Sequence, residues 1–118
     1  MTKLFKEQLQ NTGVDVRKAL DRFMNNESLY HSFLSKFLSD KSYIQLEENY
    51  NAGNVREAFM HAHTLKGIAA NLEINYLLQI LHPLTEKLRA DDMEGTGEMM
   101  RELKIRHDSL CELIKKNL

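Results

Sequence analysis

Hydrophobic residues recur at three- and four-residue intervals along nearly the whole chain, the spacing that places them on one face of an α-helix. One proline and five glycines are the only strong helix breakers. The pattern predicts seven helices, at about residues 3–11, 16–23, 27–39, 40–53, 55–72 and 75–91, with a last helix that carries residues 100–114. Residues 91–97 are the clearest loop.

Residues suited to helix ends stand near the predicted boundaries. Asp15 is placed to cap the second helix, and Gly53 follows the fourth. Asn54 with Glu57 three residues later has the spacing of a capping box for the fifth helix. Pro83 removes one backbone hydrogen bond inside the sixth helix and predicts a kink there.

Amphipathic helices joined by short loops bury their apolar stripes most simply by packing against one another in antiparallel order. We therefore expect an all-α fold, an antiparallel up-and-down four-helix bundle with short additional N-terminal helices. Those first two helices would cap or flank the bundle.

Length and composition narrow the class of protein. The 118 residues fit one domain, and 42% hydrophobic with 28% charged residues are ordinary values for a globular chain. The net charge is −1, so the chain does not have the excess of basic residues that is typical of a nucleic-acid binder. Cys111 is the single cysteine, which excludes a framework of disulfides within the chain. No apolar run is long enough to span a membrane. We expect a cytoplasmic protein that binds neither nucleic acid nor membrane. We also expect a monomer, because packing of the bundle buries the apolar stripes of the helices.

The helix predicted at residues 55–72 carries the most informative pattern. Its apolar residues fall within one arc that we expect to face the core: Val55, Ala58, Phe59, Ala62, Leu65, Ala69 and Leu72. His63 lies about 100° around from Ala62, so its ring is expected in solvent beside that arc. Met60, Gly67 and Ala70 share the side of His63, with Lys66 between them and the core.

An exposed imidazole on a small, uncharged helix face is suited to nucleophilic chemistry. The neutral ring nitrogen is a good nucleophile near neutral pH. If His63 accepted a phosphoryl group, Lys66 one turn away would reach the phosphate oxygens. Gly67 carries no side chain and would let a partner come close.

The segment Ala62-His63-Thr64-Leu65-Lys66-Gly67-Ile68-Ala69-Ala70-Asn71-Leu72 resembles the signature of histidine-containing phosphotransfer (HPt) domains, the phosphorelay modules of two-component signalling. The resemblance extends to residues 13–23 and to the apolar spacing after the motif, and covers roughly residues 10–92. It implies a single HPt-like helical domain over residues 1–118.

The resemblance also implies a function and its residues. His63 would accept a phosphoryl group from a receiver-domain aspartate and pass it to another receiver domain, with Lys66 assisting the phosphate. Gly67 would keep the docking face open, and because the helical spacing places Met60 and Ala70 on the same uncharged side, we expect Met60, Gly67 and Ala70 to form the docking surface. The expected partners are response-regulator receiver domains and a hybrid histidine kinase. The chain would be a phosphocarrier and not an enzyme, with no cofactor or metal of its own, and Mg²⁺ would be bound by the receiver domain.

One residue departs from the family pattern. Glu73 stands where the family usually has Gly at the end of the histidine helix. We therefore expect the turn into the next helix to be closed differently, with His63, Lys66 and Gly67 unaffected.

Two other interpretations compete with the phosphorelay one. Glu57 and His61 are four residues apart and would both reach one metal ion, but two ligands without a third make a weak zinc site. The runner-up function is a non-phosphorylated helical adaptor that binds a signalling partner through the surface around His63. Such an adaptor has no need of an exposed imidazole with Lys66 and Gly67 at these spacings.

Overall fold

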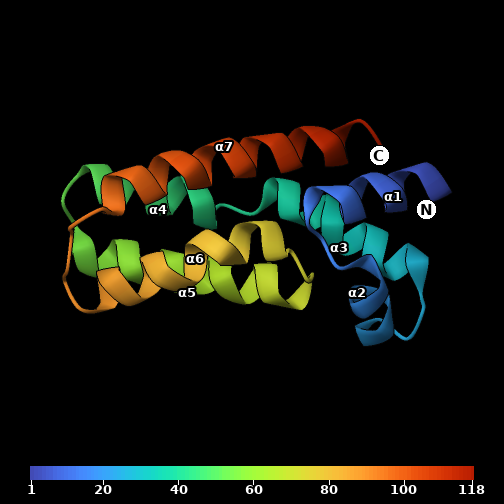
Figure 1. Cartoon of the computed structure of the whole chain (residues 1–118), viewed down its shortest axis with the longest axis horizontal. Coiled ribbons are helices and arrows are strands. Elements are labelled where there is room, and N and C mark those ends of the chain that lie inside the picture. The colour runs from blue at the N-terminus through green and yellow to red at the C-terminus, as the bar shows by residue number, and fades with distance from the viewer.

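Seven helices and the turns between them make up the computed structural model, which describes residues 1–118 (Figure 1). The helices are α1 Lys3–Thr12, α2 Val16–Arg22, α3 Glu27–Ser39, α4 Ser42–Asn51, α5 Val55–Asn71, α6 Asn75–Arg89 and α7 Thr96–Lys115. The chain has no strand, so the all-α prediction is confirmed. The loop expected at residues 91–97 is shorter, because α7 already begins at Thr96.

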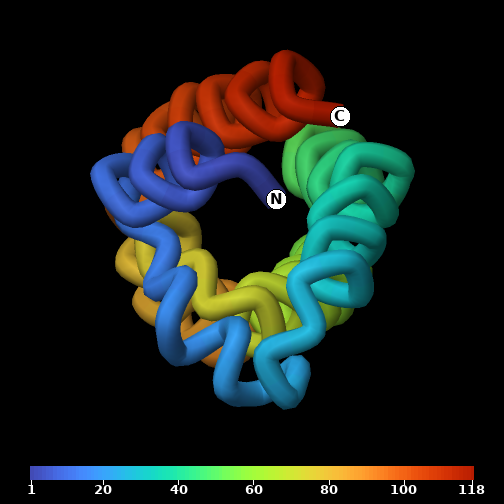
Figure 2. The backbone as a smooth tube through the Cα atoms, turned by 90° about the vertical axis from the view of Figure 1, so that its right-hand side faces the viewer, coloured from blue at the N-terminus to red at the C-terminus, as the bar shows by residue number.

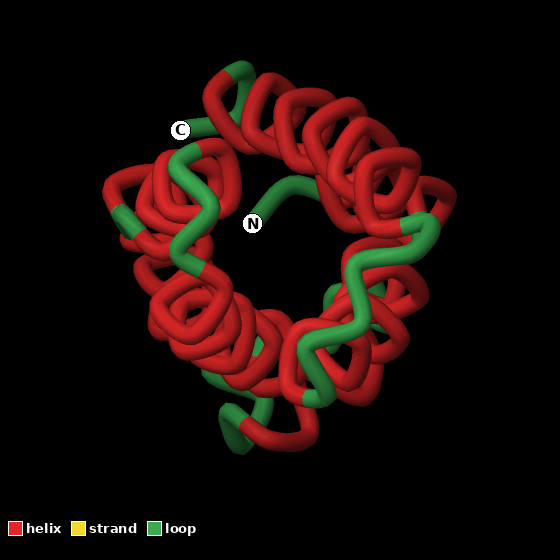
Figure 3. Tube along the Cα trace, turned by 90° about the vertical axis from the view of Figure 1, so that its left-hand side faces the viewer, coloured by secondary structure: helices red, strands yellow, loops and turns green.

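Four antiparallel columns form the bundle. The first column consists of α3 and α4, which follow one another with a break at residues 40–41, and α5, α6 and α7 supply the other three. Helix α5 packs between α4 and α6, and α7 packs against α6 and α3. Viewed along the long axis, the columns surround a common core (Figure 2). Figure 3 shows the opposite end, where the α4–α5 and α6–α7 loops lie. The predicted up-and-down bundle is therefore confirmed.

The short helices α1 and α2 flank one end of the bundle beside α3 and the C-terminal part of α7 (Figure 1). Two backbone hydrogen bonds join their corner to the turn between α5 and α6. Asp15 N donates to Glu73 O at 2.9 Å and Tyr76 N donates to Gly13 O at 2.9 Å, and between these bonds Val14 and Ile74 are paired as an isolated antiparallel bridge. The N-terminal corner is thus attached to the end of α5.

Helix caps agree with the sequence at some ends and differ at others. The side chain of Asp15 accepts from Lys18 N, as expected for the cap of α2. The capping box predicted for α5 is wrong, because the Asn54 side chain makes no cap hydrogen bond. Its Nδ2 instead lies 3.4 Å from Oδ1 of Asn49, so the amide is turned toward α4.

Asp40 does not open α4 as expected. It ends α3, and its Oδ1 accepts from Ser42 N at 2.9 Å, so the carboxylate orders the break within the first column. Pro83 lies inside α6, which continues on both sides of it.

The core runs through the middle of the four columns and is built from 24 buried hydrophobic residues. Helix α5 contributes small residues to it: its buried positions are Ala58, Ala62, Leu65 and Ala69. Small side chains on the buried face allow neighbouring helices to approach closely. The exposed face of α5 is therefore bordered by α4 on one side and α6 on the other.

His107 lies on the apolar face of α7, as the spacing predicts. Its ring is stacked on Tyr43 of α4, with centroids 4.2 Å apart and an interplanar angle of 14°, and its Nε2 is 3.7 Å from the Cys111 sulfur. Burial lowers the pKa of His107 and raises the pKa of Cys111 to about 11. Both side chains are neutral packing groups at pH 7.

None of the helices combines the length and apolar character required to cross a lipid bilayer.

Candidate functional site

His63 lies on the exposed face of α5, near the middle of the helix. Its neighbours Ala62 and Leu65 are fully or almost fully buried, which fixes the rotation of the helix and turns His63 to solvent. Thr64 beside it uses its hydroxyl to donate to Met60 O at 3.1 Å, a bond within the same helix. The imidazole is therefore held on a rigid, well-packed element and remains open to a partner.

The ring of His63 stacks on Phe59, one turn earlier in α5. The ring centroids are 5.9 Å apart and the planes differ by 29°. Phe59 was expected in the core arc, but it is only half-buried, at the edge of that arc. Its remaining surface is available to the histidine ring.

Arg89 near the end of α6 lies over the ring of Phe59, with its Cζ 4.9 Å from the ring centroid. Its Nε is also 3.5 Å from Oε2 of Glu86 in the same helix, and both of these side chains are more than half exposed. The structure therefore brings a second cationic side chain, from another helix, to the neighbourhood of His63. The sequence pattern of α5 does not indicate this residue.

Lys66 is half-buried on α5, three residues after His63. Its ammonium takes part in none of the ion pairs of the structure. Because no carboxylate neutralises it, its full charge acts on groups that come near His63.

The strip of Met60, Gly67 and Ala70 adjoins His63 as the helical spacing predicts. Met60 is 51% exposed, which is high for a large apolar side chain, and Ala70 is half-buried. A Cβ built on Gly67 would meet nothing within 4 Å. Packing within the chain therefore does not require a glycine at position 67.

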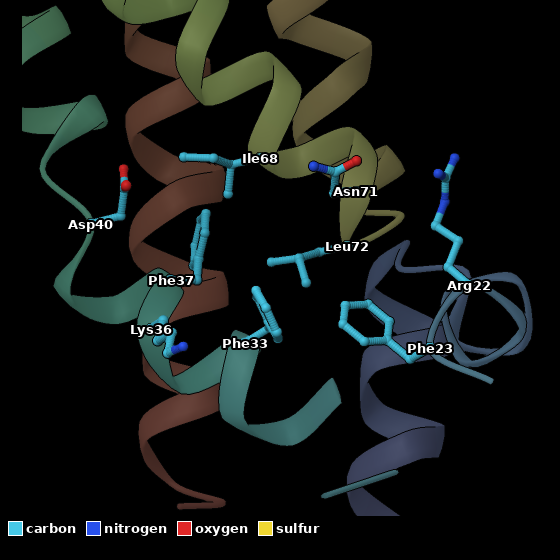
Figure 4. A pocket seen from close by; sticks show the side chains of 9 residues that line it. All are labelled: Arg22, Phe23, Phe33, Lys36, Phe37, Asp40, Ile68, Asn71 and Leu72. Atoms are coloured by element: carbon cyan, nitrogen blue, oxygen red, sulfur yellow. The ribbon is translucent and has the colours of Figure 1, made fainter. Parts of the chain in front are cut away.

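A groove of about 520 Å³ lies beyond the C-terminal half of α5, between α2, α3 and α5 (Figure 4). Its floor is aromatic and aliphatic, and Arg22, Lys36 and Asp40 stand at its rim. The apolar lining residues are Phe23, Phe33, Phe37, Ile68 and Leu72. His63 does not line this groove.

The turn after α5 is closed by Glu73 in the left-handed conformation, with φ 55°. Its side chain is only 6% exposed, and Oε1 is 2.8 Å from Nε of Arg22, while Oε2 is 4.0 Å from Nζ of Lys18. The departure from the family pattern is thus accommodated by backbone strain and an ion pair with α2. The groove wall that carries Arg22 is attached to the end of the His63 helix by this contact.

The Glu57 and His61 pair is not joined by a third ligand. Nowhere do three or more His, Cys, Asp or Glu side chains gather closely enough to hold one metal ion. Glu57 is exposed and His61 is half-buried.

Comparison with protein families shows that residues 1–113 of the 118 match the Hpt domain. Comparison with curated proteins and comparison with solved structures gave no match.

Proposed function

The chain belongs to the Hpt domain family, whose members act in phosphorelays as phosphocarriers, and on that premise we propose that it carries the phosphoryl group on His63. In this proposal a receiver-domain aspartate is the donor and a second receiver domain is the acceptor. The observation that supports it best is the exposed imidazole of His63 on α5, with the unpaired Lys66 at +3 and open space at Gly67 at +4.

The proposed transfer needs little from the carrier beyond a positioned nucleophile. A ring nitrogen of His63 attacks the phosphorus of the aspartyl phosphate with its lone pair. The N–P bond forms as the P–O bond to the aspartate breaks, and the aspartate leaves as a carboxylate. The second transfer is the reverse reaction on another receiver domain. We expect the receiver domain to supply Mg²⁺.

Lys66 supports this reaction through its charge. The ammonium stands one turn from the ring on the same element, so it stabilises the negative phosphate oxygens without a conformational change. Because the side chain is half-buried, water screens it less than a fully exposed lysine, and docking of a receiver domain reduces that screening further.

Hpt domains interact with receiver domains and kinases, and we propose that Met60, Gly67 and Ala70 form the docking surface here. The exposed Met60 supplies apolar contact area, and Gly67 leaves room for the receiver aspartate to reach the ring. A hybrid histidine kinase that carries a receiver domain would dock in the same way.

The test is incubation with a receiver domain carrying ³²P on its aspartate, in the presence of Mg²⁺. Wild-type protein should take up label that is acid-labile and alkali-stable, as expected of a phosphoramidate. His63→Gln should take up none, while His82→Gln, which changes an exposed histidine on α6, should label normally. Label on His63→Gln, or acid-stable label, would contradict the assignment. Binding of the receiver domain without any label would instead favour the non-phosphorylated adaptor.

A further inference from the structure

The surroundings of His63 differ between the two sides of α5. At about 100° per residue, Phe59 at −4 and Lys66 at +3 fall about 40° and 60° to one side of His63. Met60 at −3 and Gly67 at +4 fall at similar angles to the other side. Arg89 of α6 covers Phe59, so the first side faces α6. The α6 side therefore carries the ring and both cations, and the opposite side of α5 has no charged side chain within one turn of His63.

Phe59 is the residue that connects the two parts of the α6 side. Its ring is stacked on His63 at 5.9 Å and lies under the guanidinium of Arg89 at 4.9 Å. Phe59 is itself held in place, because it is partly buried and packs against the core. A fixed ring thus contacts two exposed side chains, His63 and Arg89, of which Arg89 is also paired with Glu86.

We propose that Phe59 is a positioning residue for phosphoryl transfer, which orients the imidazole of His63 and anchors Arg89 as a second cation for the phosphoryl group. The inference rests on the proposed function of His63. It assigns the phosphoryl oxygens to the α6 side, near Arg89 and Lys66, and leaves the Gly67 side for the approach of the receiver domain.

The physical basis is that contact with the Phe59 ring restricts the orientations of the exposed His63 side chain. An exposed histidine samples several rotamers, and only those that direct a ring nitrogen at the phosphorus are productive. Stacking on Phe59 favours one orientation by an amount typical of aromatic pairs. The cation–π contact similarly holds Arg89 close to the site, although its ion pair with Glu86 reduces the net charge that it offers.

The test compares Phe59→Leu, which keeps an apolar side chain, with Phe59→Tyr, which keeps the ring. Single-turnover transfer from the phosphorylated receiver domain is measured over a range of receiver concentrations. We expect Phe59→Leu to lower the maximal rate constant about three- to tenfold with the half-saturating concentration unchanged. Phe59→Tyr should restore the rate. A purely structural role would not be rescued by the ring specifically.

Arg89→Met tests the anchored cation, because it keeps much of the apolar stem and removes the charge. It should also lower the maximal rate constant, and the double variant with Phe59→Leu should be no slower than the slower single variant. Such non-additivity is expected of residues that act through one another. Multiplicative effects would overturn the anchoring of Arg89 by Phe59.

Phe33→Leu is the matched control. Phe33 is another partly exposed phenylalanine, and it lies under a cation, Lys36, whose Nζ is 4.8 Å from the ring centroid. It makes none of the aromatic contacts of His63. We expect Phe33→Leu to leave the maximal rate constant unchanged.

A second measurement needs no phosphoryl transfer. In NMR spectra of the unphosphorylated protein, the ring protons of His63 should move toward the positions of a free histidine in Phe59→Leu and stay in place in Phe33→Leu. Unchanged shifts and an unchanged rate in Phe59→Leu would overturn the positioning role while the proposed function stands. Absence of label from wild-type protein would overturn both.

Discussion

Nε of Arg22 lies 2.8 Å from Oε1 of Glu73, and this ion pair connects α2 to the turn that ends the His63 helix. The two partners differ in environment, since the Arg22 side chain is 50% exposed and the Glu73 side chain is 6% exposed. Glu73 also holds a left-handed backbone conformation that is costly for residues with a Cβ. The contact therefore combines a stabilising interaction with a strained turn at one position.

Substitution of Arg22 is predicted to lower the free energy of unfolding more than substitution of Glu73. Arg22→Met leaves the buried carboxylate with only Lys18 at 4.0 Å, and should lower the free energy of unfolding by about 2 kcal/mol. Glu73→Gly removes the carboxylate, returns Arg22 to solvent and relieves about 1 kcal/mol of backbone strain, so the net loss should be under about 1 kcal/mol. Urea denaturation of both variants measures the difference. Equal losses would show that the carboxylate is solvated without Arg22.

Lys66→Ala is predicted to slow transfer without weakening the fold. The ammonium has no ion pair to lose, and Ala is a better helix former than Lys, so the melting temperature should change little. The rate of labelling by the phosphorylated receiver domain should fall because one cation near the phosphate is missing. Lys115→Ala, at the exposed end of α7, is a control of the same type because Lys115 also takes part in none of the ion pairs. A Lys66→Ala variant that transfers at the wild-type rate would remove Lys66 from the site.

Gly67→Gln is predicted to separate folding from docking. A Cβ at this position meets nothing within 4 Å, and glycine inside a helix costs up to about 1 kcal/mol relative to residues with a side chain. The isolated protein should therefore be as stable as wild type or slightly more stable, while labelling by the receiver domain slows. Thermal unfolding and transfer rate are measured on the same sample. Transfer at the normal rate would mean that the receiver domain approaches His63 from another side.

His107 is predicted to make stability depend on pH. Burial lowers its pKa in the folded state, opposed by the nearby Asp108 and Asp40 and reinforced by Lys104. The unfolded chain therefore binds this proton more readily, and the free energy of unfolding should fall as the pH drops below the unfolded value of about 6.5. His107→Phe keeps a ring against Tyr43 and should show a weaker decline between pH 7.5 and 5.5 in urea denaturation. Parallel pH profiles for the two proteins would assign the dependence to other groups.

Much of the architecture could be predicted because it depends on local patterns. Periodic apolar residues and the Asp15 cap identify the elements, and the apolar arc of α5 fixes which way His63 points. The capping box at Asn54 failed because its side chain has an alternative partner, Asn49, on the preceding helix. The spacing of residues along a helix does not predict a competing hydrogen bond to a residue on the other side of a turn.

The details around His63 depend on contacts between helices. Phe59 fits the core arc by its angle, yet it lies at the edge of that arc and is only partly buried. Arg89 reaches the site only through the packing of α6 on α5. Neither the left-handed φ of Glu73 nor its pairing with Arg22, 51 residues away, has a local signal in the sequence.

The junction between residues 13–15 and residues 73–76 has a consequence for the order of folding. Its backbone bonds join segments about sixty residues apart, and such contacts carry a larger loop-closure cost than those within an α-helical hairpin. We expect α4 to α7 to assemble first through contacts between chain neighbours, with α1 and α2 docking afterwards. Helix α5, which carries His63, would then be ordered before the N-terminal corner closes over its end.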